Sequence, residues 1–217
     1  MLLLIDLDNT LIDRSAAFRR WSERWAPDHG GSPDDIAWLI ATDREGYEPR
    51  EHFAELISAR FAVPADVALL ELRAGMIDQV ELDPQVGRAL GEAADAGWSP
   101  VVVTNGSVRQ QEAKLRHTGL DRLVAAWVIS EGAGVSKPDR RIFEVAAEAV
   151  GRSLDAGGWM IGDHAAYDVG GGHAAGLRTV WLRRGREWPA DLPYRPTHIA
   201  DDCAAAIRLT AADRARP

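Results

Sequence analysis

Residues 2–10 read LLLIDLDNT, and this segment is the most informative one about the architecture of the chain. A short apolar run that ends in charge is typical of a buried strand whose carboxyl end emerges at a site. Asp6 and Asp8 lie two positions apart, so both carboxylates would point to one side if the chain stays extended between them. Two like charges this close are costly unless a cation or a shared proton relieves their repulsion. The segment therefore predicts a functional site, although Asp8, Asn9 and Thr10 are also of the type that caps a helix.

Beyond this segment, apolar runs of strand length alternate with helical patterns. The runs cover residues 100–103, 126–129, 159–161 and 179–182, and the helical patterns cover residues 84–96, 107–118, 139–150 and 165–175. Strands that alternate with helices of this size indicate an α/β fold with a parallel sheet covered on both faces, which makes a three-layer, Rossmann-like core. Ligands of such sheets bind beyond the carboxyl ends of the strands.

Residues with reactive side chains follow the predicted strands. Thr104 and Asn105 come after the second strand, Asp163 comes after the fourth, and Asp168 follows five residues later. Lys137 lies in the loop that follows the third strand. Because the carboxyl ends of parallel strands share one edge of the sheet, these groups are predicted to converge with the aspartates of the first strand.

The choice of basic residues gives a second indication. The chain has 25 Lys and Arg residues, and only Lys114 and Lys137 are lysines. Lysine is a compact point charge that can approach a phosphate and a carboxylate together, whereas arginine is a planar fork. Lys137, in a loop before a helix, is predicted to point into the site. Lys114 lies in a polar helical segment, residues 110–116, and is expected to belong to a solvated helix face.

Residues 15–80 differ in character from the rest of the chain, because they show helical stretches and no strand-like alternation. Ser32 to Asp35 combine an N-cap, a proline at the first helical position and acids in the first turn. A further helix is expected to begin near Val63–Asp66 and to run to about Gln79, with its apolar positions at Val67, Leu70 and Ile77. The predicted domains are a core of residues 1–14 and 81–217 and a four-helix insertion, or cap, of residues 15–80.

Composition limits the class of protein. The chain has 217 residues, of which 46% are hydrophobic and 27% charged, as in ordinary soluble globular proteins. Neither a membrane span nor a signal peptide is expected, since the apolar start is short and lacks a basic flank. A single cysteine, Cys203, excludes an intrachain disulfide and fits a reducing cytosol. The net charge of −8 argues against broad binding to nucleic acid or membrane surfaces.

Several other residues are expected to serve packing or solvation. The glycines at positions 170–172 are better explained by close helix–sheet packing than by a phosphate-binding loop. His164 is expected to be a bystander, and residues 183–186 (RRGR) a solvated turn. The remaining expectations are packing for Trp21, Trp25 and Trp38 and a solvated face for Arg19, Arg20 and Arg24.

Four short motifs together resemble those of the haloacid dehalogenase (HAD) superfamily. They are DLDNTL at residues 6–11, TNG at residues 104–106, KP at residues 137–138, and GD at residues 162–163 with Asp168. The motifs occur in the family's order and cover essentially the whole chain, with Asn9 where glycine is commoner. The helical insertion resembles the family's type-1 cap, and residues 104–151 resemble the nucleotidase-like and phosphoglycolate-phosphatase-like subgroup.

The resemblance implies Mg²⁺-dependent hydrolysis of a small phosphomonoester. A carboxylate at Asp6 can attack phosphorus and form an aspartyl-phosphate, which divides hydrolysis into two easier displacements. The expected Mg²⁺ ligands are Asp6, Asp163 and, by family analogy, the backbone carbonyl of Asp8. The side chain of Asp8 would stay free to act as general acid and then as general base.

The other motif residues are expected to handle phosphate. The hydroxyl of Thr104 and the backbone N–H of Asn105 would hold the phosphoryl oxygens, and Lys137 would balance their charge. Asp168 would position the lysine or a metal-bound water.

Other functions fit less well. A phosphomutase of the same superfamily would keep all four motifs and return the phosphoryl group to a sugar. A dehalogenase uses the first aspartate alone, so Asp8 disfavours it, and a phosphonate-cleaving member needs a cap lysine that residues 15–80 lack. A signalling receiver domain is about half this length and has no inserted cap. A catalytically inactive phosphate-binding module would not need every reactive residue that is present here. The sequence specifies neither the substrate nor the oligomeric state.

Overall fold

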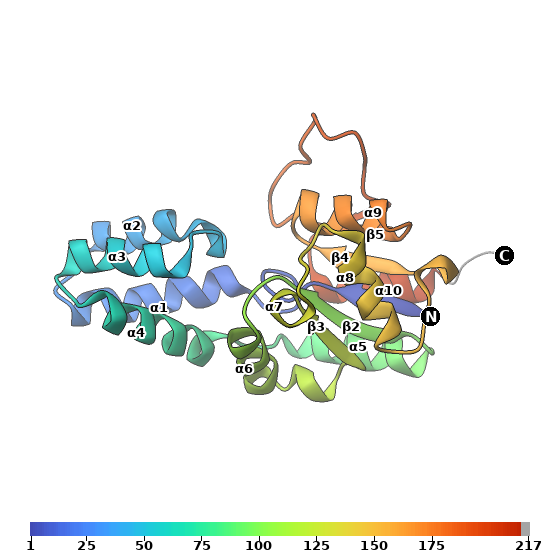
Figure 1. The fold of residues 1–217 in the computed structure, drawn as a ribbon, viewed down its shortest axis with the longest axis horizontal. Coiled ribbons are helices and arrows are strands. Elements are labelled where there is room, and N and C mark those ends of the chain that lie inside the picture. The colour runs from blue at the N-terminus through green and yellow to red at the C-terminus, as the bar shows by residue number, and fades with distance from the viewer. Residues whose placement is uncertain (214–217) are drawn as a thin grey trace. The chain divides into compact units, whose positions relative to one another are not determined.

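The computed structural model describes residues 1–213, and the chain divides into two compact units (Figure 1). The core unit consists of Met1–Ile12 and Leu82–Pro217, and the helical unit consists of Asp13–Glu81. Within the described part, no helix is both long enough and apolar enough to cross a membrane.

A six-stranded sheet, in which all neighbouring strands run parallel, forms the centre of the core unit. Its strands are β1 (Leu2–Ile5), β2 (Ser99–Thr104), β3 (Ala126–Ile129), β4 (Trp159–Gly162), β5 (Arg178–Leu182) and β6 (His198–Ala200). Their order in the sheet is β3-β2-β1-β4-β5-β6. From β1 the chain adds β2 and β3 on one side of the sheet and then β4, β5 and β6 on the other side. The order in which the strands are added therefore reverses between β1 and β4. Open α/β sheets bind their ligands at this kind of reversal.

Helices cover both faces of the sheet. They are α5 (Pro84–Asp95), α6 (Val108–Thr118), α7 (Ser130–Ala133), α8 (Arg140–Glu148), α9 (Gly171–Ala174) and α10 (Cys203–Ala212), with a π-helical turn over Ala165–Gly170. On one face, Leu2 and Leu4 of β1 share a core with Ile142 and Phe143 of α8. The alternate residues Leu3 and Ile5 are also fully buried, on the face where α5 and α10 pack together (Figure 1). Burial on both faces explains why the strand is apolar at every position.

The predicted α/β fold with a parallel sheet and a helical insertion is confirmed. Strand β6 was not expected from the sequence, because it is a three-residue edge strand with an exposed central residue, Ile199. The helix expected over residues 165–175 is divided into the π-helical turn and the short α9.

The helical unit contains four α-helices, α1 (Arg14–Asp28), α2 (Pro33–Asp43), α3 (Arg50–Phe61) and α4 (Ala65–Gln79). Ser32 caps α2 as predicted, and a reciprocal capping box with Asp35 completes its first turn. Helix α1 is capped by Asp13, so none of the three candidate capping residues after β1 caps a helix. Trp21 and Trp25 are buried and stack on one another, which confirms their packing role.

The apolar face predicted for α4 is wrong. Val67 and Leu70 are exposed, at 38% and 63%, whereas Ala68 and Leu72 are buried. The buried face also contains Met76, and Gly75 lies close to α1, where a Cβ would be 2.3 Å from the ring of Trp21. The close approach at Gly75 fixes which face of the helix turns toward α1.

Candidate active site

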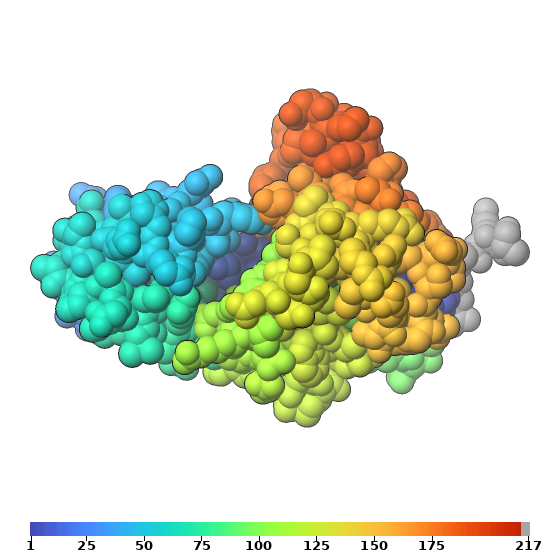
Figure 2. Space-filling model, in the orientation of Figure 1, coloured from blue at the N-terminus to red at the C-terminus, as the bar shows by residue number. Residues whose placement is uncertain are grey.

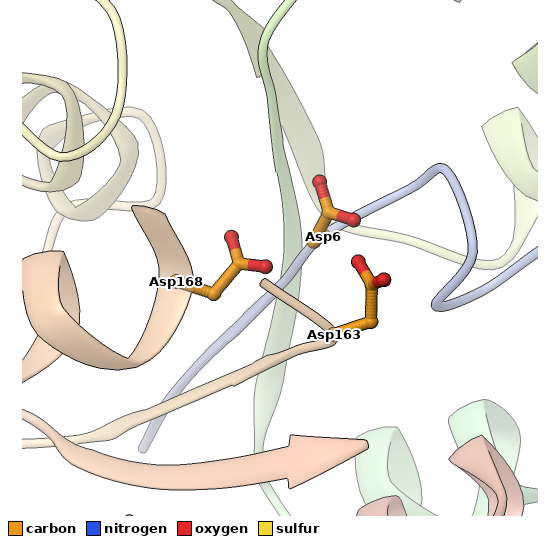
Figure 3. A group of neighbouring side chains, drawn as sticks. All are labelled: Asp6, Asp163 and Asp168. Carbon is orange, nitrogen blue, oxygen red and sulfur yellow. The ribbon is translucent and has the colours of Figure 1, made fainter. Parts of the chain in front are cut away.

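Three buried carboxylates meet beyond the ends of β1 and β4, where the strand order reverses (Figure 3). Asp6 follows β1, and its backbone N–H donates to the carbonyl of Ile161 in β4 at 2.9 Å. Asp163 directly follows β4, and Asp168 comes from the π-helical turn. One carboxylate oxygen from each aspartate lies within 4.8 Å of the others. The two central strands and the turn after β4 therefore bring together residues that are distant in the sequence.

The π-helical turn holds Asp168 in place. Asp168 Oδ2 accepts a hydrogen bond from the backbone N–H of His164 at 2.9 Å. The Nδ1 atom of His164 in turn accepts from the N–H groups of Ala166 and Tyr167, at 3.2 and 3.0 Å. His164 thus caps the turn that carries Asp168, a structural role that its sequence position did not reveal.

Lys137 is the cation of this cluster. Its Nζ atom donates to Asp6 Oδ1 at 2.6 Å and to Asp168 Oδ1 at 2.7 Å, and its side chain is 3% exposed. Asn105 fixes the lysine loop, because its side chain accepts from Lys137 N–H at 2.9 Å and donates to the Lys137 carbonyl at 3.1 Å. The loop after β2 and the loop after β3 are therefore joined at the site, and Lys137 points into it as predicted.

The electrostatics of the cluster are dominated by burial. Burial raises the pKa of Asp6 to about 8, with the charges of Asp168 and Asp163 adding to the shift and the Lys137 ammonium opposing it. Burial also raises the pKa of Asp163 to about 7; Asp168 adds to this, and Arg186 opposes it. The two buried carboxylates Asp6 and Asp168 raise the pKa of Lys137 against the effect of its own burial. Asp6 and Asp163 thus lie in a buried space with too little positive charge to ionise both easily.

This donor set fits a hard divalent cation. Carboxylate oxygens are the ligands that Mg²⁺ and similar ions prefer, and a cation would counter the burial and the repulsion that together raise the two carboxyl pKa values. Asp168 differs from the other two, since its two oxygens already accept from Lys137 and from the His164 N–H. Its contacts suit the positioning role expected for it.

Asp8 lies apart from this cluster and has partners of its own. The strand ends at Ile5, and the chain turns back after Asp6, where the N–H groups of Thr10 and Ile12 both donate to the Leu7 carbonyl, at 3.3 and 3.1 Å. Asn9 has a φ of 62°, a left-handed conformation that asparagine tolerates and that explains glycine's preference there. The extended strand thus gives way to a tight turn that begins at Leu7 and contains Asp8 and Asn9.

The side chain of Asp8 is held by helix α6. Lys114 Nζ donates to both carboxylate oxygens, at 2.8 and 2.7 Å, and Gln111 Nε2 donates to Oδ2 at 2.9 Å. Gln111 Nε2 also lies 2.7 Å from the hydroxyl oxygen of Thr104, which is buried at the end of β2. The carboxylate of Asp8 is therefore engaged by two residues of one helix, neither of which was expected from the sequence to be its partner.

The expectation that Lys114 belongs to a solvated face is also wrong, because its side chain is only 8% exposed. Gln111 and Lys114 are three residues apart, so they lie on the same face of α6. This face turns inward toward Asp8. The scarcity of lysine in the chain was the signal that could have identified Lys114.

The basic segment after β5 is not simply a solvated turn. Arg186 donates to Asp163 Oδ2 at 2.9 Å and to the Asp163 carbonyl at 2.8 Å, and Arg184 donates to the carbonyl of Asn9 at 3.3 Å. Only Arg183 behaves as expected, with a half-exposed side chain that pairs with Asp201. The residues that follow form a projecting lobe on the surface of the core unit (Figure 2).

The glycines at 170–172 serve packing, as predicted. A Cβ on Gly171 would lie 2.9 Å from the Phe143 ring, and one on Gly172 would lie 2.9 Å from Met160 of β4. These contacts place α9 directly against its neighbours in the core.

Comparison with known proteins agrees with this geometry. A family profile for haloacid dehalogenase-like hydrolases matches residues 1–176. Pyrimidine 5′-nucleotidase YjjG of Escherichia coli (strain K12) is 42% identical over 81 residues, which cover 37% of this chain and 36% of that protein. Phosphoserine phosphatase of Thermus thermophilus is 36% identical over 104 residues, covering 48% of this chain and 41% of that protein. Two (S)-2-haloacid dehalogenases match at 27% and 28% identity.

The matched stretches thus span less than half of the nucleotidase and of the phosphoserine phosphatase. The likeness of fold extends over the whole chain. The crystal structure of the HAD-hydrolase YfnB from Bacillus subtilis bound to magnesium superposes with a TM-score of 0.75, at 21% identity, covering 96% of this chain and 97% of that one. On the profile match, the four motifs and the shared fold, the chain belongs to the haloacid dehalogenase-like hydrolase family.

Proposed function

We propose that this hydrolase cleaves a small phosphomonoester, with Asp6 as the nucleophile and Asp8 as the general acid and base. The observation that carries the proposal is the buried cluster of Asp6, Asp163 and Asp168 around Lys137. A nucleophile for phosphorus needs positive charge beside it, because the phosphate that it attacks is itself an anion. Lys137, 2.6 Å from Asp6, supplies part of that charge.

The rest of the charge is proposed to come from Mg²⁺. Asp6, Asp163 and the backbone carbonyl of Asp8 would hold the ion, and Asp168 would position Lys137. When bound, Mg²⁺ would neutralise the repulsion between the Asp6 carboxylate and the incoming phosphate. The oxygen-only donor set supports this choice of ion, and the relative YfnB was crystallised with magnesium.

In the proposed first step, an oxygen of Asp6 forms a bond to phosphorus while the bond from phosphorus to the alcohol oxygen breaks. The proton of the Asp8 carboxyl passes to that oxygen, so the alcohol leaves in neutral form. The Thr104 hydroxyl, the Asn105 N–H and the Lys137 ammonium would bind the phosphoryl oxygens as charge accumulates on them.

In the second step, the oxygen of a water molecule attacks the phosphorus of the aspartyl-phosphate. The bond between phosphorus and Asp6 breaks, and Asp8 accepts a proton from the water. Inorganic phosphate leaves, and both aspartates return to their initial state.

The relatives support a phosphate ester as substrate, because two of them carry the names of a nucleotidase and a phosphoserine phosphatase. Dehalogenases among the relatives make removal of halide from a 2-haloacid the second candidate. Asp8 favours the phosphatase. Two hydrogen bonds from Lys114 and one from Gln111 hold its carboxylate in place, and dehalogenation does not require a carboxylate at this position.

The test is a screen of the purified protein with Mg²⁺ against nucleotides, sugar phosphates, phosphoserine and phosphoglycolate, with 2-haloacids in parallel. We expect saturable release of phosphate from at least one ester and no release of halide. Asp6→Asn should abolish turnover with the fold unchanged by circular dichroism, whereas Asp155→Asn, at an exposed position, should leave it intact. Halide release without phosphate release, or turnover by the Asp6→Asn protein, would contradict the proposal.

A further inference from the structure

We infer that Lys114 and Gln111 form a clamp on α6 that positions the carboxylate of Asp8 for proton transfer. This inference rests on the proposed phosphatase function and extends it to two residues outside the four motifs. The clamp is defined by the contacts of Lys114 and Gln111 with Asp8 and Thr104.

The clamp constrains Asp8 from two directions. Lys114 Nζ spans both oxygens of the carboxylate, at 2.8 and 2.7 Å, so it limits rotation of the group about its last bond. Gln111 Nε2 contacts only Oδ2, at 2.9 Å, and so distinguishes the two oxygens. When Asp8 carries its proton on Oδ1, that oxygen no longer accepts from Lys114, but Oδ2 still accepts from both Lys114 and Gln111. Because proton transfer requires hydrogen-bond reach and alignment, a carboxyl group held in one orientation transfers protons more effectively than a rotating one.

The clamp also ties Asp8 to the phosphate-binding loop. The same Nε2 atom of Gln111 lies 2.7 Å from Thr104 Oγ1, and Gln111 is 2% exposed. Thr104 is one of the residues proposed to bind the phosphoryl group, so Gln111 sets the spacing between the proton donor and the phosphate-binding hydroxyl. The leaving oxygen must lie between these two points.

The difference in exposure between Asp8 and Lys114 favours a positioning role for this ion pair over a purely stabilising one. Asp8 is 25% exposed and Lys114 is 8% exposed, so the carboxylate remains accessible while the lysine does not. A surface ion pair would contribute little, and burying a lysine is costly unless its partner is fixed. The chain has two lysines, and each contacts one of the two aspartates after β1. Lys137 donates to Asp6, and Lys114 donates to Asp8.

The experiment compares two phosphate esters whose leaving groups differ in their need for a proton. Nitrophenolate leaves readily without one, whereas phenolate needs protonation, so the proton of Asp8 matters more for phenyl phosphate than for 4-nitrophenyl phosphate. The value of kcat/KM reports the first displacement, in which Asp8 donates this proton to the ester oxygen as the P–O bond breaks. Both esters are assayed with Mg²⁺.

We expect Lys114→Met to lower kcat/KM for phenyl phosphate by about 10- to 100-fold, within the usual range for a general acid, and to lower it much less for 4-nitrophenyl phosphate. Asp8→Asn should show the same selectivity. In the Asp8→Asn background, Lys114→Met should have no further effect, because the clamp then holds a group that cannot donate the proton. Arg116→Met, on an exposed part of the same helix, is the matched control and should change neither value.

A second variant covers the case in which Lys114→Met does not fold. Gln111→Leu removes the other half of the clamp and keeps the Lys114–Asp8 ion pair, and it should show the same selective loss for phenyl phosphate. Equal losses for both esters, no loss at all, or an undiminished effect in the Asp8→Asn background would overturn the inference. Failure of the wild-type protein to hydrolyse either ester would instead count against the proposed function, which keeps the two failures distinguishable.

Discussion

At the scale of single residues, the site is organised by two lysines in a chain that otherwise uses arginine. Lys137 lies between Asp6 and Asp168, and Lys114 spans the two oxygens of Asp8. A compact ammonium group fits between two carboxylate oxygens, where a planar guanidinium would need more room. The structure thus gives a geometric reason for lysine rather than arginine at these two positions.

A pH dependence follows from the raised pKa values of Asp6 and Asp163. These reach about 8 and about 7 in the folded protein, against 3.8 for the ordinary side chain. Between about pH 4 and pH 8 the folded state therefore holds protons that the unfolded chain has released. Because the folded state binds more protons there, its stability falls as the pH rises through this range. Chemical denaturation in EDTA at several pH values measures this directly.

The control for this prediction is Asp163→Asn, which removes one of the two titrating groups. The loss of stability with rising pH should be smaller in this variant, chiefly below about pH 7. Added Mg²⁺ should raise the stability of the wild-type protein most at the alkaline end, where the carboxylates are ionised. Stability that is constant or rises over the same range would show that Asp6 and Asp163 are ionised in the folded protein.

The sequence identified Lys137 but misjudged Lys114, for a physical reason. Lys137 follows a strand, and strand ends in a parallel sheet share an edge, so its place could be inferred from chain order. Lys114 is in the middle of a polar helix, where exposure depends on what the helix packs against. The segment 110–116 has too few apolar residues to show which face turns inward.

At the scale of elements, β4 and the π-helical turn after it together position Asp163 and Asp168. The strand ends at Gly162, and a Cβ there would lie 2.2 Å from Asp168 Oδ2. The carboxylate of Asp168 therefore occupies the space that a side chain at residue 162 would fill. Only glycine at this position lets the turn fold back so closely over the end of the strand.

Gly162→Ala is therefore expected to displace Asp168 from Lys137. We expect the free energy of unfolding to fall by about 1–3 kcal/mol, the usual cost of overpacking, and phosphatase activity to fall with it. Gly91→Ala is the matched control in α5, where a Cβ would meet nothing within 4 Å. That change should raise stability by about 0.5–1 kcal/mol, since alanine favours a helix over glycine. Equal effects of the two substitutions on stability and activity would show that the close approach of Asp168 to residue 162 does not matter.

Element positions were predictable where burial made the pattern strong. The runs at 100–103, 126–129 and 179–182 match β2, β3 and β5 closely, because strands that are largely buried in a covered sheet are apolar at most positions. Two features escaped this reasoning. The face of α4 depends on the close approach of Gly75 to Trp21, and the π-helical turn depends on hydrogen bonds accepted by His164, and hydrophobic spacing records neither of them.

At the scale of the whole molecule, the order of the strands explains why four short motifs can form one site. Strand β1 lies between β2 and β4, so residues after three neighbouring strands meet although about a hundred residues separate the first from the second. This part of the architecture could be predicted because the alternation of strands and helices restricts the sheet to few topologies. The substrate could not be predicted, because its recognition depends on side-chain positions that no periodicity encodes.

The central claim is that Asp6 takes up the phosphoryl group. The most direct measurement uses the Asp8→Asn protein, which lacks the proposed base for the second step and should therefore accumulate the aspartyl-phosphate. The protein is incubated with Mg²⁺ and 4-nitrophenyl phosphate, quenched in acid, reduced with borohydride and mapped by peptide mass spectrometry. We predict modification at Asp6 alone, and none in the Asp6→Asn/Asp8→Asn double variant. Modification at another residue, or hydrolysis by the Asp6→Asn protein without any covalent intermediate, would contradict the account.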